Sequence, residues 1–224
     1  MGRPQLVHQS STLGRVELDH VLIAVADLAA AARQIQTRYG LASVEGGHHP
    51  GWGTANRIVP LGASYLELIA VVDQAAAADS SVGRWVASGA SRLGRPLGWA
   101  VRTGNLDQLA RRLGLTMSAG SRVTPTGEVL CWRSAGIEQA AAEPSLPFFI
   151  GWAAGTRLPG TTAVAHPVAP ARIAKLLLEG DPGRLAAWLG NHALPIDMRA
   201  GSPAVAAVVL STAMGETVLG AEQP

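Results

Sequence analysis

An internal repeat governs how this chain can fold, because three of its segments share one plan. Each segment begins with an apolar stretch typical of a β-strand, continues with an Asp or Asn, and then shows an amphipathic helical pattern that stops at a glycine. The Asp or Asn stands where a helix N-cap is expected. These positions are Asp27, Asn105 and Asp181, spaced 78 and 76 residues apart. Such a regular spacing predicts three related units.

Three short strand-like stretches, rich in β-branched residues and separated by Gly and Pro, follow each predicted helix. Each unit therefore has the order strand, helix, strand, strand, strand, and we expect an α+β fold built from repeated βαβββ modules. The predicted organisation is module one at 16–72, a helical connector at 73–96, module two at 97–152, a linker at 153–170 and a third βαβββ-like module at 171–220.

Composition and charge limit the partners of the chain. Its 224 residues carry 18 Lys and Arg against 16 Asp and Glu, a formal net charge of +2, and the basic residues are scattered. Binding to nucleic acid needs clustered positive charge, so we expect no nucleic-acid partner. The longest uncharged run near the end, 200–215, is shorter than the ~18 apolar residues of a membrane span, so we expect no membrane partner either.

The cysteine content and the first residues of the chain indicate the cellular compartment of the protein. Cys131 is the single cysteine, which excludes an intrachain disulfide and is typical of a reducing environment. The first residues lack the apolar stretch of a secretory signal. We therefore expect a cytoplasmic protein. Cys131 lies in an apolar strand-like stretch and is predicted to be a core residue, and His166 in the linker is predicted to be exposed.

Alternation in two predicted strands places a His and a Glu on the same face of one sheet. Alternate residues from Val21 to Val25 are aliphatic and are expected beneath the helix, so His20 points the other way. The strand 65–70 divides in the same manner and leaves Glu67 on the face of His20. A buried carboxylate must be paired, hydrogen-bonded or metal-bound. A structural His–Glu pair and a functional site both satisfy this condition.

Residues 45–57 are predicted to form a loop that enters a strand and is rich in polar and aromatic side chains. Loops on rigid scaffolds often carry function, so this loop is a candidate binding element. The alternative is an ordinary surface loop with Trp52 at the edge of the core. The strand aromatics at 148, 149 and 152 are core residues by default, and Phe149 is kept as a candidate. The ligand-binding candidates are His48, Trp52, Thr54, Asn56, Arg57, Tyr65 and Phe149.

The first unit resembles the opening module of a glyoxalase-like domain of the vicinal oxygen chelate superfamily. This superfamily also includes bleomycin-resistance proteins, fosfomycin-resistance enzymes and extradiol dioxygenases. The matching pieces are Leu18-Asp19-His20-Val21, the stretch 49–57, and Tyr65-Leu66-Glu67-Leu68. The resemblance covers about residues 16–72, is looser through 152, and depends beyond that on the repeat alone.

The resemblance implies a vicinal oxygen chelate fold, in which two βαβββ modules form a curved mixed-sheet cup. Such a cup holds a divalent metal and a small oxygen-rich ligand, and the first and last strands of each module supply the metal ligands. His20 and Glu67 match those positions. Either His49 or its neighbour His48 completes the set, or the metal has been lost and the cup binds its ligand without it. Imidazole and carboxylate suit Zn, Mn, Fe or Ni. Glu67 is also the catalytic candidate, as a base when it is displaced from metal.

The second and third units depart from the family pattern. Gly98 stands where His20 aligns in unit two, and the strand 147–152 has no carboxylate to match Glu67. Two protein ligands fall short of the three plus an open position that are normal for catalytic zinc. A third unit is also more than a cup needs, so it either pairs across a homodimer or covers the first two units as a cap.

Two main hypotheses for function follow. The first is a glyoxalase-like small-molecule enzyme with metal-assisted lyase, isomerase or oxygenase chemistry on a substrate with vicinal oxygens. The second is a metal-free protein that binds or sequesters a small molecule on the same fold, similar to the bleomycin-resistance members. A weaker third is a structural module whose cup is filled by its own side chains.

Overall fold

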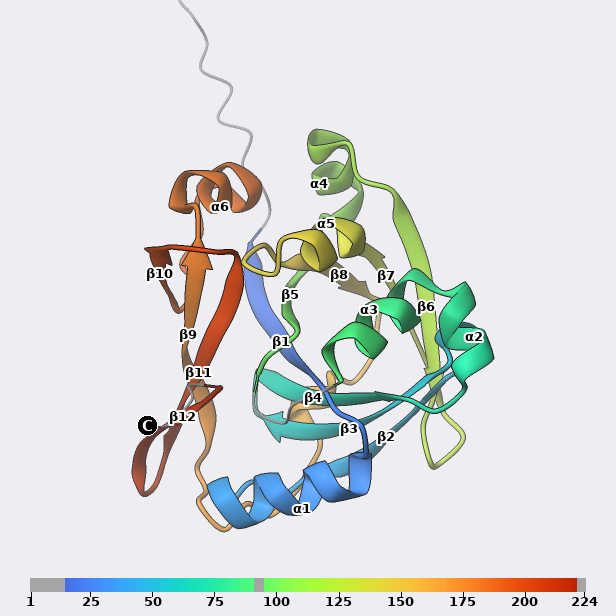
Figure 1. Cartoon of the computed structure of the whole chain (residues 1–224), viewed down its shortest axis with the longest axis vertical. Coiled ribbons are helices and arrows are strands. Elements are labelled where there is room, and N and C mark those ends of the chain that lie inside the picture. The colour runs from blue at the N-terminus through green and yellow to red at the C-terminus, as the bar shows by residue number, and fades with distance from the viewer. Residues whose placement is uncertain (1–14, 91–94, 221–224) are drawn as a thin grey trace, which may run out of the picture.

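A computed structural model describes residues 15–90 and 95–220 of the chain. The strands of these residues form a closed eight-stranded barrel and a separate four-stranded sheet (Figure 1). The barrel has the order β1-β4-β3-β2-β6-β7-β8-β5, and the sheet has the order β10-β9-β11-β12. The predicted α+β class with a curved mixed sheet is confirmed, and the cup is closed into a barrel.

The barrel is built from two successive units of the βαβββ type, the second of which has an additional helix before its last strand. The first contains β1 (Val16–Ala24), α1 (Leu28–Tyr39), β2 (Val44–His49), a 3-10 turn (Pro50–Trp52), β3 (Thr54–Leu61) and β4 (Ser64–Val71). The second contains β5 (Gly98–Thr103), α4 (Leu106–Leu113), β6 (Met117–Val123), β7 (Val129–Ala135), α5 (Ile137–Ala142) and β8 (Phe148–Trp152).

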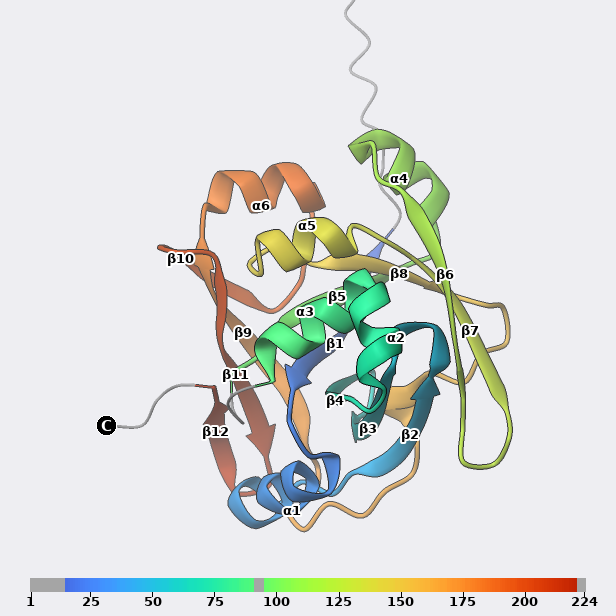
Figure 2. The same ribbon diagram turned by 45° about the vertical axis from the view of Figure 1, so that its right-hand side comes forward.

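Two helices, α2 (Gln74–Asp79) and α3 (Ser81–Gly89), lie within the predicted connector, of which residues 91–94 lie outside the described residues. The helices α3 and α5 lie across the barrel (Figure 2). After a 3-10 turn at Pro159–Thr161, the remaining elements form the four-stranded sheet: β9 (Arg172–Gly180), α6 (Pro182–Leu189), β10 (Ile196–Ala200), β11 (Ala204–Thr212) and β12 (Gly215–Leu219). No helix of the described residues has the length and apolar character to cross a membrane.

All three predicted residues stand at helix N-caps, and two of them make the capping hydrogen bond. Asp27 Oδ1 accepts a hydrogen bond from Ala30 N at 2.8 Å, and Asp181 Oδ1 accepts one from Gly183 N at 2.8 Å. Asn105 stands at the third N-cap, but its side chain makes no cap hydrogen bond. There the hydroxyl of Thr103 accepts from the backbone N–H of Asn105 at 3.1 Å instead. The repeat therefore reflects a common plan more than identical capping chemistry.

The prediction of a loop over residues 45–57 is wrong at its start. β2 continues through His49 and pairs with β3, and a register shift between Glu45 and Gly47 marks a bulge that absorbs the two glycines. Gly47 has a φ of 138°, and a Cβ there would lie 2.1 Å from the carbonyl oxygen of Val123. This glycine therefore allows β6 to approach β2 where the two modules meet.

Two further expectations are corrected by the structure. Cys131 is exposed, because its neighbours Leu130 and Trp132 occupy the inward positions of the alternating strand β7. His166 is not free at the surface. Its Nδ1 accepts from Ala42 N at 3.0 Å, and its Nε2 donates to the carbonyl of Pro60 at 2.6 Å. The histidine thus fastens the linker to the barrel.

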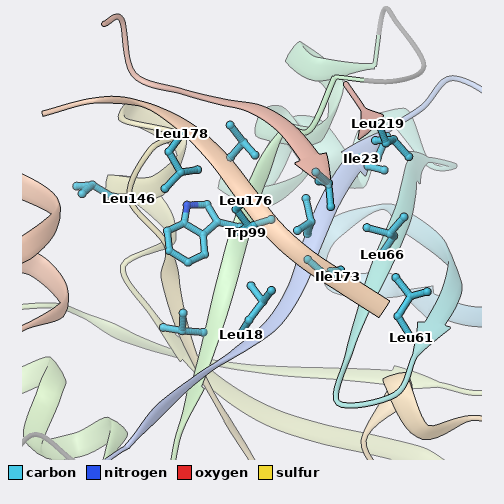
Figure 3. Packing of buried hydrophobic residues seen from close by; sticks show 14 of the residues in the cluster. Leu18, Ile23, Leu61, Leu66, Trp99, Leu146, Ile173, Leu176, Leu178 and Leu219 are labelled. Atoms are coloured by element: carbon cyan, nitrogen blue, oxygen red, sulfur yellow. The ribbon is translucent and has the colours of Figure 1, made fainter. Parts of the chain in front are cut away.

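The main hydrophobic core lies outside the barrel, between its wall and the four-stranded sheet. Ile23 of β1 and Trp99 of β5 belong to this core, together with Leu176 and Leu178 of β9, and all four are at most 1% exposed. Figure 3 shows the leucines of β9 beside Trp99. The opposite face of β1 points into the barrel. The third module therefore covers the outside of the barrel and leaves the interior to the residues that alternate with the core.

Replacing Leu176 with Ala tests this packing. Leu176 is fully buried, whereas its neighbour Leu177 points to the other face and is only half-buried. We expect Leu176→Ala to lower the free energy of unfolding by about 2–5 kcal/mol because it leaves a cavity. Leu177→Ala is the matched control and should cost clearly less. Urea denaturation followed by circular dichroism measures both, and equal losses would contradict the assigned packing.

Candidate active site

A pocket lies inside the barrel beneath α3 and α5, and most of its wall is apolar. Four of the six tryptophans of the chain line it: Trp52, Trp85, Trp132 and Trp152. Polar side chains gather in one part of the lining: His20, His49, Asn56, Tyr65, Glu67 and Arg122. The free volume is about 40 Å³, which is room for a few water molecules. Aromatic rings therefore fill much of the interior, and a larger ligand must displace some of them.

His20 and Glu67 meet in this pocket because their strands are parallel neighbours. β1 pairs with β4 so that His20 is opposite Tyr65 and Leu22 is opposite Glu67. The Nε2 atom of His20 lies 3.4 Å from Oε2 of Glu67, and both side chains are less than one-tenth exposed. The ring of Tyr65 stacks on the imidazole with centroids 4.7 Å apart. Alternation along two strands is thus sufficient to assemble the acid and the imidazole.

Asp19 holds the other side of the imidazole. In a regular strand, neighbouring side chains point to opposite faces, but the register of β1 on β5 shifts between Leu18 and His20. This bulge lets Asp19 Oδ1 reach His20 Nδ1 at 2.7 Å. The second oxygen, Oδ2, accepts a hydrogen bond from Trp152 Nε1 at 3.0 Å. With Nδ1–H donated to Asp19, the Nε2 atom of His20 faces Glu67.

The second carboxylate oxygen of Glu67, Oε1, is also held by a hydrogen bond. Asn56 Nδ2 donates to Glu67 Oε1 at 2.6 Å, and Asn56 Oδ1 accepts from Arg122 Nη1 at 3.2 Å. A continuous buried chain of polar contacts therefore runs from Asp19 through His20, Glu67 and Asn56 to Arg122. Such a network fixes the orientation of every member.

The surroundings of two other pocket residues, His49 and Tyr65, shift their pKa values. Burial lowers the pKa of His49 to about 4, although the charge of Glu67 opposes this shift. His49 is therefore neutral near pH 7, with its Nδ1 atom 3.0 Å from the hydroxyl oxygen of Thr54. Burial, reinforced by the negative charges of Asp19 and Glu67, raises the pKa of Tyr65 well above its usual range. Tyr65 thus remains a protonated phenol.

The structure brings most of the predicted site residues to the pocket. His20, His49, Trp52, Asn56, Tyr65 and Glu67 line it. Thr54 is buried beside His49 and supports it. Strand alternation explains this grouping, because in β3 and β4 every second side chain faces the barrel interior.

Three predicted ligand-binding residues lie elsewhere. His48 is exposed, because it alternates with the inward His49. Arg57 points out of the barrel, where its Nε donates to the hydroxyl of Ser43 at 3.1 Å. Phe149 packs in the outer core with its ring stacked on Trp188 at 5.7 Å. Its neighbour Phe148 is the residue that lines the pocket, because a shift of one residue in a strand reverses the face.

Sequence reasoning missed Asp19 as a partner of His20 and missed Arg122, Trp85 and Trp132 as lining residues. The motif Leu18-Asp19-His20-Val21 contains Asp19, but strand alternation argues against its reaching His20. Arg122 lies in a strand whose other described residues are mainly exposed, so its pattern gave no sign of burial. The β6–β7 pairing that turns Arg122 and Trp132 inward is a property of the closed barrel, and Trp85 enters the pocket from α3.

The metal that the family resemblance implies would need a set of donor side chains in the pocket. Among residues 15–90 and 95–220, no group of three or more His, Cys, Asp or Glu side chains could hold a metal ion. His20 and Glu67 provide two adjacent donors, and His49 does not complete a cluster with them. Two donors do not fit a catalytic centre with three protein ligands and an open position.

Comparison with known proteins gives one family match. The family model described as a glyoxalase-like domain matches residues 18–193. No curated protein sequence matches the chain.

Solved structures are also similar to this chain. A hypothetical protein from Staphylococcus aureus has a TM-score of 0.69 at 13% identity, covering 89% of this chain and 92% of that chain, so the likeness concerns the fold. Methylmalonyl-CoA epimerase from Mycobacterium tuberculosis has a TM-score of 0.42 at 22% identity, covering 60% of this chain and 85% of that chain. A variant of the Streptomyces coelicolor methylmalonyl-CoA epimerase has a TM-score of 0.46 at 21% identity, covering 65% of this chain and 100% of that chain.

The lowered pKa of His49 predicts how stability depends on pH. The unfolded chain protonates this histidine as the pH falls below about 6.5, whereas the folded protein does so only near a pKa of about 4. The unfolded state therefore binds more protons in this interval, and stability falls with pH by about 2–3 kcal/mol between pH 7.5 and 4.5 from this group. Urea unfolding at both pH values measures the loss.

The variant His49→Gln should lose less stability than the wild type over the same interval, because glutamine does not titrate. His48→Gln is the matched control, since His48 is the adjacent but exposed histidine, and it should behave like the wild type. An equal loss in His49→Gln and the wild type would show that His49 does not produce the effect.

Proposed function

The chain belongs to the glyoxalase-like domain family of the vicinal oxygen chelate superfamily, and we propose that its barrel encloses an active site for proton transfer on a small organic molecule. The supporting observation is the buried contact of 3.4 Å between His20 Nε2 and Glu67 Oε2 in a pocket whose wall is mostly apolar. Two titratable groups in direct contact, one of them oriented from behind by Asp19, are typical of acid–base catalysis.

In this proposal Glu67 is the catalytic base. A proton leaves a carbon next to a carbonyl group and passes to Glu67 Oε2, while its electron pair moves toward the carbonyl oxygen. His20 accepts or returns a proton at Nε2, because its Nδ1 is held by Asp19. Return of the proton to another position or face gives an isomerase, and loss of a neighbouring leaving group gives a lyase.

The surroundings suit such a reaction. Asn56 fixes one oxygen of Glu67 and leaves the other beside His20, so the base is oriented before a substrate arrives. Tyr65 stacks on the imidazole and restricts its rotation. The tryptophan rings leave little room for water, which strengthens electrostatic interactions within the pocket. An apolar or aromatic substituent of the substrate would pack against these rings.

Two alternatives use the same pocket. Metal-assisted lyase, isomerase or oxygenase chemistry on vicinal oxygens would require Zn, Mn, Fe or Ni at His20 and Glu67 with His49, and the described donor set does not support it. A metal-free binding or sequestering protein is favoured by the four tryptophan rings around so small a space. The third hypothesis, a pocket filled permanently by these rings, predicts that no ligand enters.

Substitution of Glu67 tests the proposed chemistry. We expect the wild-type protein to exchange α-hydrogens of 2-hydroxyacetophenone or phenylpyruvate for deuterium in D₂O, measured by proton NMR. Glu67→Gln should slow exchange by about 10²- to 10⁴-fold because the amide cannot accept the proton. Glu45→Gln changes an exposed glutamate of the same barrel and should leave the rate unchanged. Exchange that persists in Glu67→Gln, or that the wild type never catalyses, would count against the proposal.

Metal removal separates the first alternative from the proposal. Because the described residues supply two donors where three are usual, we expect exchange to survive dialysis against EDTA. Elemental analysis of protein purified without a chelator should find much less than one equivalent of Zn, Mn, Fe or Ni. One equivalent of metal, lost together with activity in a folded His20→Ala variant, would instead favour metal-assisted catalysis.

A further inference from the structure

Arg122 is buried inside the barrel and has no carboxylate partner among the described residues. It is 6% exposed, and none of the ion pairs among the described residues includes it. Its Nη1 donates to Asn56 Oδ1, whereas its Nε is buried with no hydrogen-bond partner. Burial of an unpaired guanidinium is strongly unfavourable unless something else compensates the charge.

The neighbouring strand leaves space for this guanidinium. A Cβ on Gly46 would lie 2.0 Å from Asn56 Oδ1 and 2.6 Å from Arg122 Nη1. Any side chain at position 46 would therefore displace the Arg122–Asn56 pair. The absence of a side chain at this point of β2 is a condition for the buried position of Arg122.

A second buried donor of the same pocket also lacks a partner. Trp85, which is 6% exposed, lines the pocket from α3, and its Nε1–H has no acceptor within residues 15–90 and 95–220. Buried donors are hydrogen-bonded in most proteins, and exceptions call for an explanation. Two such donors around one pocket indicate that the acceptor is supplied by a ligand.

We propose that the pocket binds a small aromatic carboxylate, with Arg122 as the anion-binding residue and Trp85 Nε1 as a second donor. This inference rests on the proposed function only in using the same pocket. The planar guanidinium matches the two oxygens of a carboxylate, and the tryptophan rings match an apolar body. Because Asp19 and Glu67 already place negative charge nearby, a singly charged group fits better than a phosphate dianion.

Arg122 lies close enough to Glu67 for a ligand bound by Arg122 to reach this proposed base. Asn56 joins Arg122 to Glu67 through hydrogen bonds of 3.2 and 2.6 Å. A carboxylate held by Arg122 therefore places the rest of a small molecule within the part of the pocket that Glu67 and His20 line. Arg122 thus selects the substrate class, and Glu67 acts on it.

Matched probes test the proposal directly. Benzoate and 3-phenylpropanoate are compared with benzamide and 3-phenylpropanamide, which have similar shapes and no charge. Binding is followed by tryptophan fluorescence and by isothermal titration calorimetry at fixed ionic strength. We expect each carboxylate to bind the wild-type protein about 10- to 100-fold more tightly than its amide. Equal affinity for the two members of a pair, or no binding of any probe, would overturn the proposal.

Substitutions then assign the preference to Arg122. Arg122→Gln should abolish the preference for carboxylates, and Arg122→Lys should retain only part of it because the ammonium lacks the planar fork. Trp85→Phe keeps the ring, removes the N–H, and should weaken carboxylate binding several-fold. Arg133→Gln is the matched control, since Arg133 is half-exposed and paired with Asp107. Retention of the preference in folded Arg122→Gln would refute the assignment.

Two further measurements keep the outcomes distinct. Circular dichroism and thermal unfolding establish whether each variant is folded. If Arg122→Gln is unfolded, the comparison of carboxylate with amide probes on the wild-type protein tests the proposal by itself. The same titrations on Glu67→Gln separate this inference from the proposed function. Glu67→Gln should keep the preference for carboxylates whether or not hydrogen exchange depends on Glu67, and loss of the preference there would contradict the role of Arg122.

Discussion

The pocket and the packing of the whole barrel depend on the parallel pairing of β1 with β4. In this register Leu22 lies opposite Glu67 and His20 opposite Tyr65. Alternation then directs one set of aliphatic residues of both strands outward, against α1 and the four-stranded sheet. It directs His20, Tyr65 and Glu67 inward, together with the apolar Leu22 and Ile69. Because both faces are buried, a slip of one residue would place the imidazole and the carboxylate in the apolar core. The same constraint thus sets both the stability of the wall and the geometry of the site.

Features that depend on local pattern were predictable from the sequence. The repeated units follow from periodicity and from glycine stops, and the shared face of His20 and Glu67 follows from alternation within two strongly apolar strands. The inward positions of Asn56 and Tyr65 follow from the same alternation in neighbouring strands. Once a resemblance to a family had fixed which strands lie side by side, two positions 47 residues apart could be placed in contact.

Features that depend on irregular backbone or on closure of the barrel were not predictable. A bulge in β1 turns Asp19 toward His20. A second bulge lets β2 continue past Gly46 and Gly47, two glycines that predict a loop when the sequence is taken alone. The choice of Phe148 over Phe149 for the interior depends on where β8 enters the sheet, which a run of apolar residues does not reveal. The burial of Arg122 requires β6 to meet β2, and a single residue pair, His48 with Val123, joins these strands within the described residues.

The two modules contribute opposite chemistry to the interior, and this explains why the second lacks the expected ligands. Module one supplies the carboxylates of Asp19 and Glu67, whereas module two supplies the guanidinium of Arg122 and the indole N–H of Trp152. At the position that corresponds to His20, a Cβ on Gly98 would lie 2.7 Å from the ring of Trp85. That glycine therefore admits an aromatic side chain where a metal ligand would otherwise project. Cationic and N–H donors in place of carboxylates and imidazoles disfavour a metal cation on that side and favour a ligand with an anionic oxygen.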